Sequence, residues 1–106
     1  MDKIPVEIKE ILLKYFELLK QNHIELKKAY LFGSYAKGSS SSNSDIDLAL
    51  VSDNFEGIRF KDRDKIRKIT LSVSSDLEVL PFNTNDFTID NPFAREIMET
   101  GILLSV

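Results

Sequence analysis

The spacing of apolar residues along the chain predicts three helices. Near the N-terminus, apolar side chains recur at three- and four-residue intervals, the period of one helix face; they are Ile8, Ile11, Leu12, Tyr15, Phe16 and Leu19. Pro5 suits a first turn, so this helix should run from about Ile4 to Asn22. A second helical period begins near Gly57 or Ile58 and ends at Val73, with a highly charged polar face. A third begins around Asp90-Asn91-Pro92 and ends before Gly101, a residue suited to the C′ position.

Apolar runs between these helices predict strands. We expect them at Ile24–Phe32, Ile46–Val51 and Asp76–Pro81, with a short final strand at Ile102–Leu104. The second run is almost wholly apolar, as expected for a strand with both faces covered. Ser34 to Lys37 should begin a short helix, and Asn83 to Phe87 a turn or one helical turn. The pattern predicts an α/β (α+β) domain with a small mixed sheet and helices packed mainly on one face.

Length and composition narrow the range of functions. A chain of 106 residues is expected to form one domain, residues 1–106. Its net charge of −3 argues against direct nucleic-acid binding as its main task. It has no cysteine, so disulfides and thiolate zinc sites are excluded. No apolar run resembles an export signal or reaches membrane-spanning length, which predicts a cytoplasmic protein.

Two carboxylates at the start of the second strand predict a cation site. Strand residues two apart point to the same face, so Asp45 and Asp47 should project side by side. At about 4 Å and an effective dielectric near 20, their repulsion is on the order of 4 kcal/mol. The pair should therefore take up a proton or a cation, and magnesium suits a site made of carboxylate oxygens.

A glycine turn before these carboxylates predicts a phosphate site. Gly33 follows an apolar run, and its missing side chain lets backbone N–H groups and the Ser34 hydroxyl approach an anion. The N-terminus of the short helix should face the same phosphate. Lys37 could neutralise phosphate oxygens, or it could be an ordinary exposed lysine. The loop from Ser39 to Asn43 is expected beside this site.

The third predicted strand holds an acidic residue in an unusual place. Glu78 lies between Leu77 and Val79, and a carboxylate within an apolar strand is costly unless a cation or hydrogen bonds compensate. Asp76 shares its face but lies at the strand entrance, where an acid is common. Whether it assists Glu78 is left open.

Gly33-Ser34, ten intervening residues and then Asp45-x-Asp47 together resemble the signature of polymerase-β-like nucleotidyltransferases, in particular the minimal nucleotidyltransferase (MNT) branch. The resemblance extends from about Lys27 to the C-terminus. It implies that Asp45, Asp47 and Glu78 are catalytic and hold two Mg²⁺ ions, with Mn²⁺ as a possible substitute. Many members have Asp at the position of Glu78, so the longer side chain leaves the metal geometry open. The resemblance also implies a nucleotide-binding set of Gly33, Ser34, Lys37 and Ser44.

The same resemblance implies transfer of AMP from ATP to a hydroxyl group, with release of pyrophosphate. MNT proteins resemble the antitoxins of toxin–antitoxin pairs whose partner is a small helical HEPN-type ribonuclease, and AMPylation of a tyrosine on that partner would block it. Larger relatives bind the acceptor with an additional domain, whose absence from this chain favours a protein acceptor. Two alternatives are a non-catalytic antitoxin that acts by binding alone and a small-molecule, aminoglycoside-type adenylyltransferase.

Two further features have ordinary explanations. His23, the only histidine, lies just past the first predicted helix and fits a helix cap or a surface position better than a catalyst. The second predicted helix is rich in arginine and lysine, interrupted by Asp62 and Asp64. A solvated face explains this pattern better than a phosphate clamp does.

Overall fold

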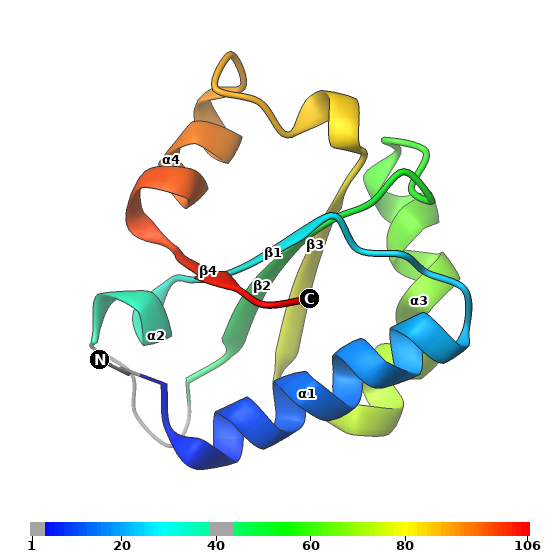
Figure 1. The fold of residues 1–106 in the computed structure, drawn as a ribbon, viewed down its shortest axis with the longest axis vertical. Coiled ribbons are helices and arrows are strands. Elements are labelled where there is room, and N and C mark those ends of the chain that lie inside the picture. Colours follow the sequence, from blue (N-terminus) through cyan, green and yellow to red (C-terminus); the bar gives the residue numbers. More distant parts are fainter. Residues whose placement is uncertain (1–3, 39–43) are drawn as a thin grey trace.

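The computed structural model describes residues 4–38 and 44–106, which form a four-stranded mixed sheet with helices around it (Figure 1). The strand order is β3-β2-β1-β4, in which β1 runs antiparallel to β2 and β4, and β2 runs parallel to β3. The strands are β1 Lys28–Phe32, β2 Ile46–Val51, β3 Leu77–Phe82 and β4 Ile102–Leu104. The loop predicted at residues 39–43 lies outside the described residues.

The helices agree closely with the sequence pattern. They are α1 Val6–Gln21, α2 Ser34–Lys37, α3 Arg59–Val73 and α4 Pro92–Thr100, with a 3-10 turn, η1, at Thr84–Asp86. The Asn91 side chain accepts hydrogen bonds from the backbone N–H groups of Phe93 and Ala94, which caps the start of α4. Within the described residues, no helix is long and apolar enough to cross a bilayer.

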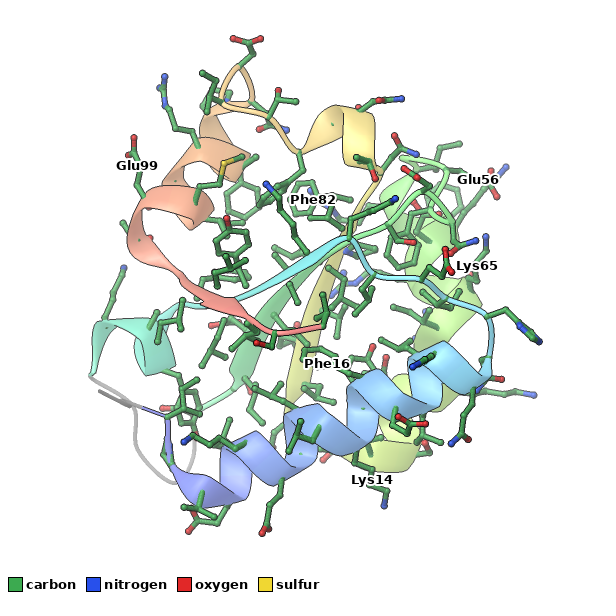
Figure 2. All side chains as sticks on the ribbon, in the orientation of Figure 1. Lys14, Phe16, Glu56, Lys65, Phe82 and Glu99 are labelled. Carbon is green, nitrogen blue, oxygen red and sulfur yellow. The ribbon has the colours of Figure 1, made fainter. Side chains whose placement is uncertain are left out.

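Both faces of the sheet are covered, by different helices (Figure 1). The two longest helices, α1 and α3, pack on one face, as expected, against alternate strand residues such as Leu31 and Leu48. The opposite face carries α4, whose Ala94 and Ile97 pack with Tyr30 and neighbouring aromatic side chains. Figure 2 shows how thoroughly side chains fill the space between these layers.

Two predicted strand limits differ from the structure. The first strand was expected from Ile24 but begins at Lys28, because the segment before it is bound to the turn after β2. The Ser52 hydroxyl donates to the carbonyl of Glu25, 2.6 Å away, and the Glu25 N–H donates to the Asn54 side chain, 2.8 Å away. The third strand was expected to end at proline, yet it continues to Phe82. An edge strand tolerates a proline whose missing N–H faces outward.

Gly101 follows α4 as predicted, but for a different physical reason. Its φ of −86° is ordinary extended backbone rather than the left-handed conformation of a C′ glycine. A Cβ added here would lie 2.6 Å from the carbonyl oxygen of Ile97 and 3.1 Å from that of Leu31. The glycine therefore permits a close approach of backbones where α4 leads into β4.

Buried polar groups anchor α3. The hydroxyls of Tyr15 on α1 and Thr70 on α3 are hydrogen-bonded at 2.6 Å, and burial raises the pKa of Tyr15 to about 12. Asp62, expected only as an interruption of a basic face, is fully buried. Its carboxylate accepts hydrogen bonds from the N–H groups of Glu56 and Gly57, at 2.8 and 2.9 Å. This aspartate fixes the turn that precedes α3.

Candidate active site

The register of the sheet brings together two of the three predicted acidic residues. Asp47 on β2 is opposite Phe32 on β1 and opposite Glu78 on β3. Residues in register project from the same face, so the two carboxylates lie side by side on the face that α4 partly covers. Asp45 lies two residues before Asp47, at the entrance to the strand, and is exposed.

Gly33 makes room for one of these carboxylates. It follows β1 with φ +73° and ψ −145°, a backbone conformation that side chains rarely adopt. A Cβ at this position would collide with the Asp47 carboxylate, approaching its Cγ to 3.0 Å. The sequence predicted that glycine serves close approach of a phosphate. The structure adds that glycine is needed for Asp47 to occupy its position.

The acidic residues act on one another electrostatically. Partial burial is the largest cause of a raised pKa for Asp47, followed by the negative charges of Asp45 and Glu78. The negative charges of Asp45 and Glu78 therefore act on Asp47, and together with its partial burial they make its ionised form less favourable. A hard divalent cation with oxygen ligands would relieve this repulsion, so the donor set fits magnesium.

Glu78 is paired with a residue that sequence reasoning did not select. Its Oε1 lies 3.5 Å from Nη2 of Arg63 on α3, and both side chains are about half exposed. Among the described residues, no group of three acidic or histidine side chains is arranged as a ready metal cluster. Asp45 adds its negative charge to that of Asp47, whereas Glu78 would have to leave Arg63 to take part in a shared cation site.

The residues predicted to bind the nucleotide lie at the same end of the sheet as Asp45 and Asp47. Ser34 begins α2 and is half-buried, whereas Lys37 ends it and is exposed. The short helix packs against both β1 and β2, and Figure 1 shows it beyond the end of β1. Ser44 is half-buried and directly precedes Asp45. The predicted phosphate and metal residues thus belong to one end of the sheet.

Two other predicted positions have structural roles. His23 is exposed, with φ 66°, and its N–H donates to the carbonyl of Lys20 at the end of α1. This agrees with a cap or surface residue. Asp76 is exposed, and its N–H donates to the Ser74 hydroxyl as the chain enters β3.

Two arginines of α3 lie beside the site, although the sequence pattern favoured a solvated face for this helix over a phosphate clamp. Arg63 pairs with Glu78, and the guanidinium of Arg59 lies 5.6 Å from the ring centre of Phe82 and 5.9 Å from that of Phe93. Their four-residue spacing places them on one side of a helix. Spacing alone could not have identified them, because it does not reveal that α3 lies beside β3.

The comparison with known families agrees with this architecture. Residues 7–105 match the family described as "Polymerase beta, Nucleotidyltransferase". The chain therefore belongs to this family and is a nucleotidyltransferase, as its strand–turn–strand motif predicted.

Relatives and a solved structure extend the comparison. "Putative protein adenylyltransferase MJ0126" of Methanocaldococcus jannaschii is 31% identical over 97 residues, covering 92% of this chain and 93% of its own. "Protein adenylyltransferase MntA" of Shewanella oneidensis is 46% identical over 46 residues, which are 42% of this chain and 33% of its own. A crystal structure titled as a putative nucleotidyltransferase from Sulfolobus solfataricus has a TM-score of 0.63 at 17% identity, covering 89% of this chain and 76% of that one. This likeness confirms the predicted fold class.

Proposed function

We propose that this protein is a magnesium-dependent protein adenylyltransferase, which moves AMP from ATP to a hydroxyl group on a partner protein. The observation that carries this proposal is the placement of Asp47. It lies against the Gly33 turn, is in register with Glu78, and has a pKa raised by burial and by both acidic neighbours. The names of the relatives support a protein as the acceptor over a small molecule.

Asp45 and Asp47 would hold the metal ions, with Glu78 as a further ligand on the acceptor side. When bound, magnesium supplies positive charge to the phosphate oxygens and lowers the pKa of the attacking hydroxyl. Two ions fit the family pattern, and manganese could replace them. Glu78 reaches this position by leaving Arg63, an exchange that costs little because the pair is exposed.

The other residues would bind and orient the triphosphate. The Gly33 turn leaves the backbone open, the Ser34 and Ser44 hydroxyls can donate to phosphate oxygens, and Lys37 offers a cation from the exposed end of α2. The acceptor oxygen attacks the α-phosphorus in line and forms a new P–O bond. The bond from that phosphorus to the oxygen that joins the α- and β-phosphates breaks, and pyrophosphate leaves. Glu78 accepts the hydroxyl proton, and orientation supplies much of the rate.

We further propose that the acceptor hydroxyl belongs to a tyrosine on a small helical HEPN-type protein, so that this chain serves as an antitoxin. The test uses purified protein, ATP, Mg²⁺ and the product of the adjacent gene, followed by intact-mass spectrometry of that product. A mass gain of one or more adenylyl groups is expected with the wild type and with Asp76→Asn, the matched acidic control. No gain is expected with Asp45→Ala/Asp47→Ala. A tight complex that silences the partner without modifying it would instead establish a binding antitoxin.

A further inference from the structure

A groove of about 620 Å³ opens between α3 and the edge strand β3, and Glu78 is the acidic site residue that lines it. Arg59, Arg63 and Arg67 line it from the helix, and the β3 segment 77–79 lines it from the sheet. Glu78 belongs both to this groove and to the candidate active site. A ligand lying in the groove would therefore extend to the proposed metal site.

The helix side of the groove is a stripe of alternating chemistry. Phe60, Arg63, Arg67 and Leu71 recur at three- and four-residue intervals, so they share one side of α3. Phe60 is 67% exposed and Leu71 is 61% exposed, although both are large and apolar. The core-facing side of the same helix is already occupied by buried Ile66. The exposed stripe is thus additional to the surface that the fold needs.

The sheet side of the groove offers unpaired backbone. β3 has β2 on one side and is the edge of the sheet in the described part of the chain. The N–H groups of Ile46 and Ser52 donate to the carbonyls of Asp76 and Phe82. A parallel ladder uses alternate residues, so the backbone groups of the residues between, Leu77, Val79 and Pro81, point outward. Pro81 has no N–H and limits the usable edge, and the part from Leu77 to Val79 can accept one more extended strand.

The charges of the groove select the ligand. Three arginines and one carboxylate line it, in a chain whose net charge is −3. Arg63 pairs with Glu78 and Arg67 pairs with Asp64, but both pairs are exposed and can exchange partners at little cost. A metal ion that engaged Glu78 would also release Arg63. The groove is therefore complementary to carboxylates.

We propose that this groove docks an extended, acidic segment of the acceptor protein, paired with the outer edge of β3. Apolar side chains of that segment would contact Phe60 and Leu71, its carboxylates would meet the arginines, and its hydroxyl residue would lie at the Glu78 end. From Phe60 to Leu71 the helix spans about 16 Å, the length of about five extended residues. The proposal rests on the proposed function, because it assigns the surface that presents the acceptor to the same site.

The test measures docking apart from nucleotide chemistry. The probe is a fluorescent peptide of about eight residues, a length that covers the groove, with a terminal tyrosine. Its alternate positions, which share one face of a strand, are valine, glutamate, glutamate and valine, and serine lies between them. The matched control peptide has lysine in place of every glutamate. Single-stranded RNA serves as a second comparison ligand. Fluorescence anisotropy is measured without ATP, on the wild type, Phe60→Ser, Arg67→Glu and Leu13→Ser. Leu13 on α1 is as exposed as Phe60 and lies outside the groove.

The acidic peptide should bind the wild type at least about 10-fold tighter than the lysine peptide, and added salt should weaken it. Phe60→Ser and Arg67→Glu should each weaken binding by roughly 3- to 10-fold, whereas Leu13→Ser should not. By NMR, bound peptide should slow the exchange of the Leu77 and Val79 amides. Equal binding of the lysine peptide, preference for RNA, no binding, or unchanged exchange at these amides would each overturn the proposal.

Thermal stabilisation by ATP and Mg²⁺ is measured on the same variants. Phe60→Ser and Arg67→Glu should keep the wild-type stabilisation, since they lie outside the metal and phosphate residues. Loss of docking with nucleotide binding retained supports the groove. Absence of any stabilisation in the wild type would count against the proposed function itself.

Discussion

Replacing Gly33 with alanine should damage nucleotide binding far more than it damages the fold. The added Cβ would lie within collision distance of the Asp47 carboxylate, 3.0 Å from its Cγ and 3.2 Å from its Cβ. The aspartate side chain is flexible, so it can rotate away, but it then leaves the position next to Glu78. The substitution therefore acts directly on the proposed metal ligand.

The stability cost comes mainly from the backbone. With φ +73° and ψ −145°, Gly33 occupies a region that costs other residues about 1–3 kcal/mol. For a domain of this size, about 1 kcal/mol corresponds to a melting temperature change of roughly 4–8 °C. Gly33→Ala should thus melt about 5–20 °C lower than the wild type and remain folded at room temperature, given a typical stability of about 5–15 kcal/mol.

The assay is thermal unfolding with and without ATP and Mg²⁺. At about 100 times the dissociation constant, a ligand adds about 2.7 kcal/mol, or roughly 10–20 °C. The wild type should show this shift, and Gly33→Ala should largely lose it. Gly38→Ala is the matched control, because its φ is +75° but, among the residues that the structure describes, no atom lies within 4 Å of the added Cβ. It should lose stability and keep the shift.

A folded Gly33→Ala protein with the full ATP–Mg²⁺ shift would refute this reasoning. That result would mean that Asp47 can move without consequence, and therefore that it does not hold the metal. Equal loss of the shift in Gly38→Ala would indicate a general effect of backbone strain in place of a specific collision.

Three further predictions concern single buried or partly buried groups. Because the pKa of Asp47 is raised in the fold, the metal-free protein loses stability as pH rises from below the usual aspartate pKa to above the raised one. Asp47→Asn should reduce this loss of stability with pH and, without metal at neutral pH, should melt at a higher temperature than the wild type. It should also lose the stabilisation by ATP and Mg²⁺. Melting curves at several pH values measure all three effects. Tyr15 has an ordinary pKa of 10.0 and a folded pKa of about 12, so its contribution to stability is complete below pH 10 and is lost as pH rises to about 12. Tyr15→Phe should remove this alkaline dependence in urea titrations and cost about 1 kcal/mol at neutral pH through the lost bond to Thr70. Asp62→Ala should lower the free energy of unfolding by about 2–4 kcal/mol, because two backbone N–H groups lose a charged acceptor. In the same urea titration, Asp64→Ala, at an exposed neighbouring position, should change this free energy by less than about 1 kcal/mol.

The sequence predicted those features that depend on neighbours along the chain. Apolar runs placed β2 and β4 at their observed limits, and the apolar pattern placed the other strands and the long helices within a few residues. The short helix α2 was expected to begin at Ser34, after the glycine turn, as observed. The alternation of a strand also predicted that Asp45 and Asp47 project side by side; in the structure Asp45 precedes β2, and its charge contributes to the raised pKa of Asp47. Glu78 was selected as a carboxylate between two apolar strand residues, but its side chain is about half exposed and pairs with Arg63, so the expected cost of burial does not arise.

Features that depend on neighbours across the fold could not be predicted. The partner of Glu78 is Arg63, and nothing local indicates that α3 lies beside the edge of β3. In the sequence Asp62 resembled an interruption of a basic run. The two N–H groups that donate hydrogen bonds to its carboxylate converge only after the turn has formed. The need for glycine at position 33 was predicted. The side chain with which a Cβ there would collide, that of Asp47, becomes evident only when β1 and β2 are paired.

The proposed function requires that Asp45, Asp47 and Glu78 hold the metal that carries the nucleotide. The most direct measurement is a crystal structure with Mn²⁺ and a non-hydrolysable ATP analogue, with manganese located by anomalous scattering. We predict manganese about 2 Å from carboxylate oxygens of Asp45 and Asp47, phosphate oxygens beside Gly33 and Ser34, and Glu78 turned from Arg63 toward the metal. Manganese bound elsewhere, or nucleotide bound while Asp47 contacts no metal, would contradict the account.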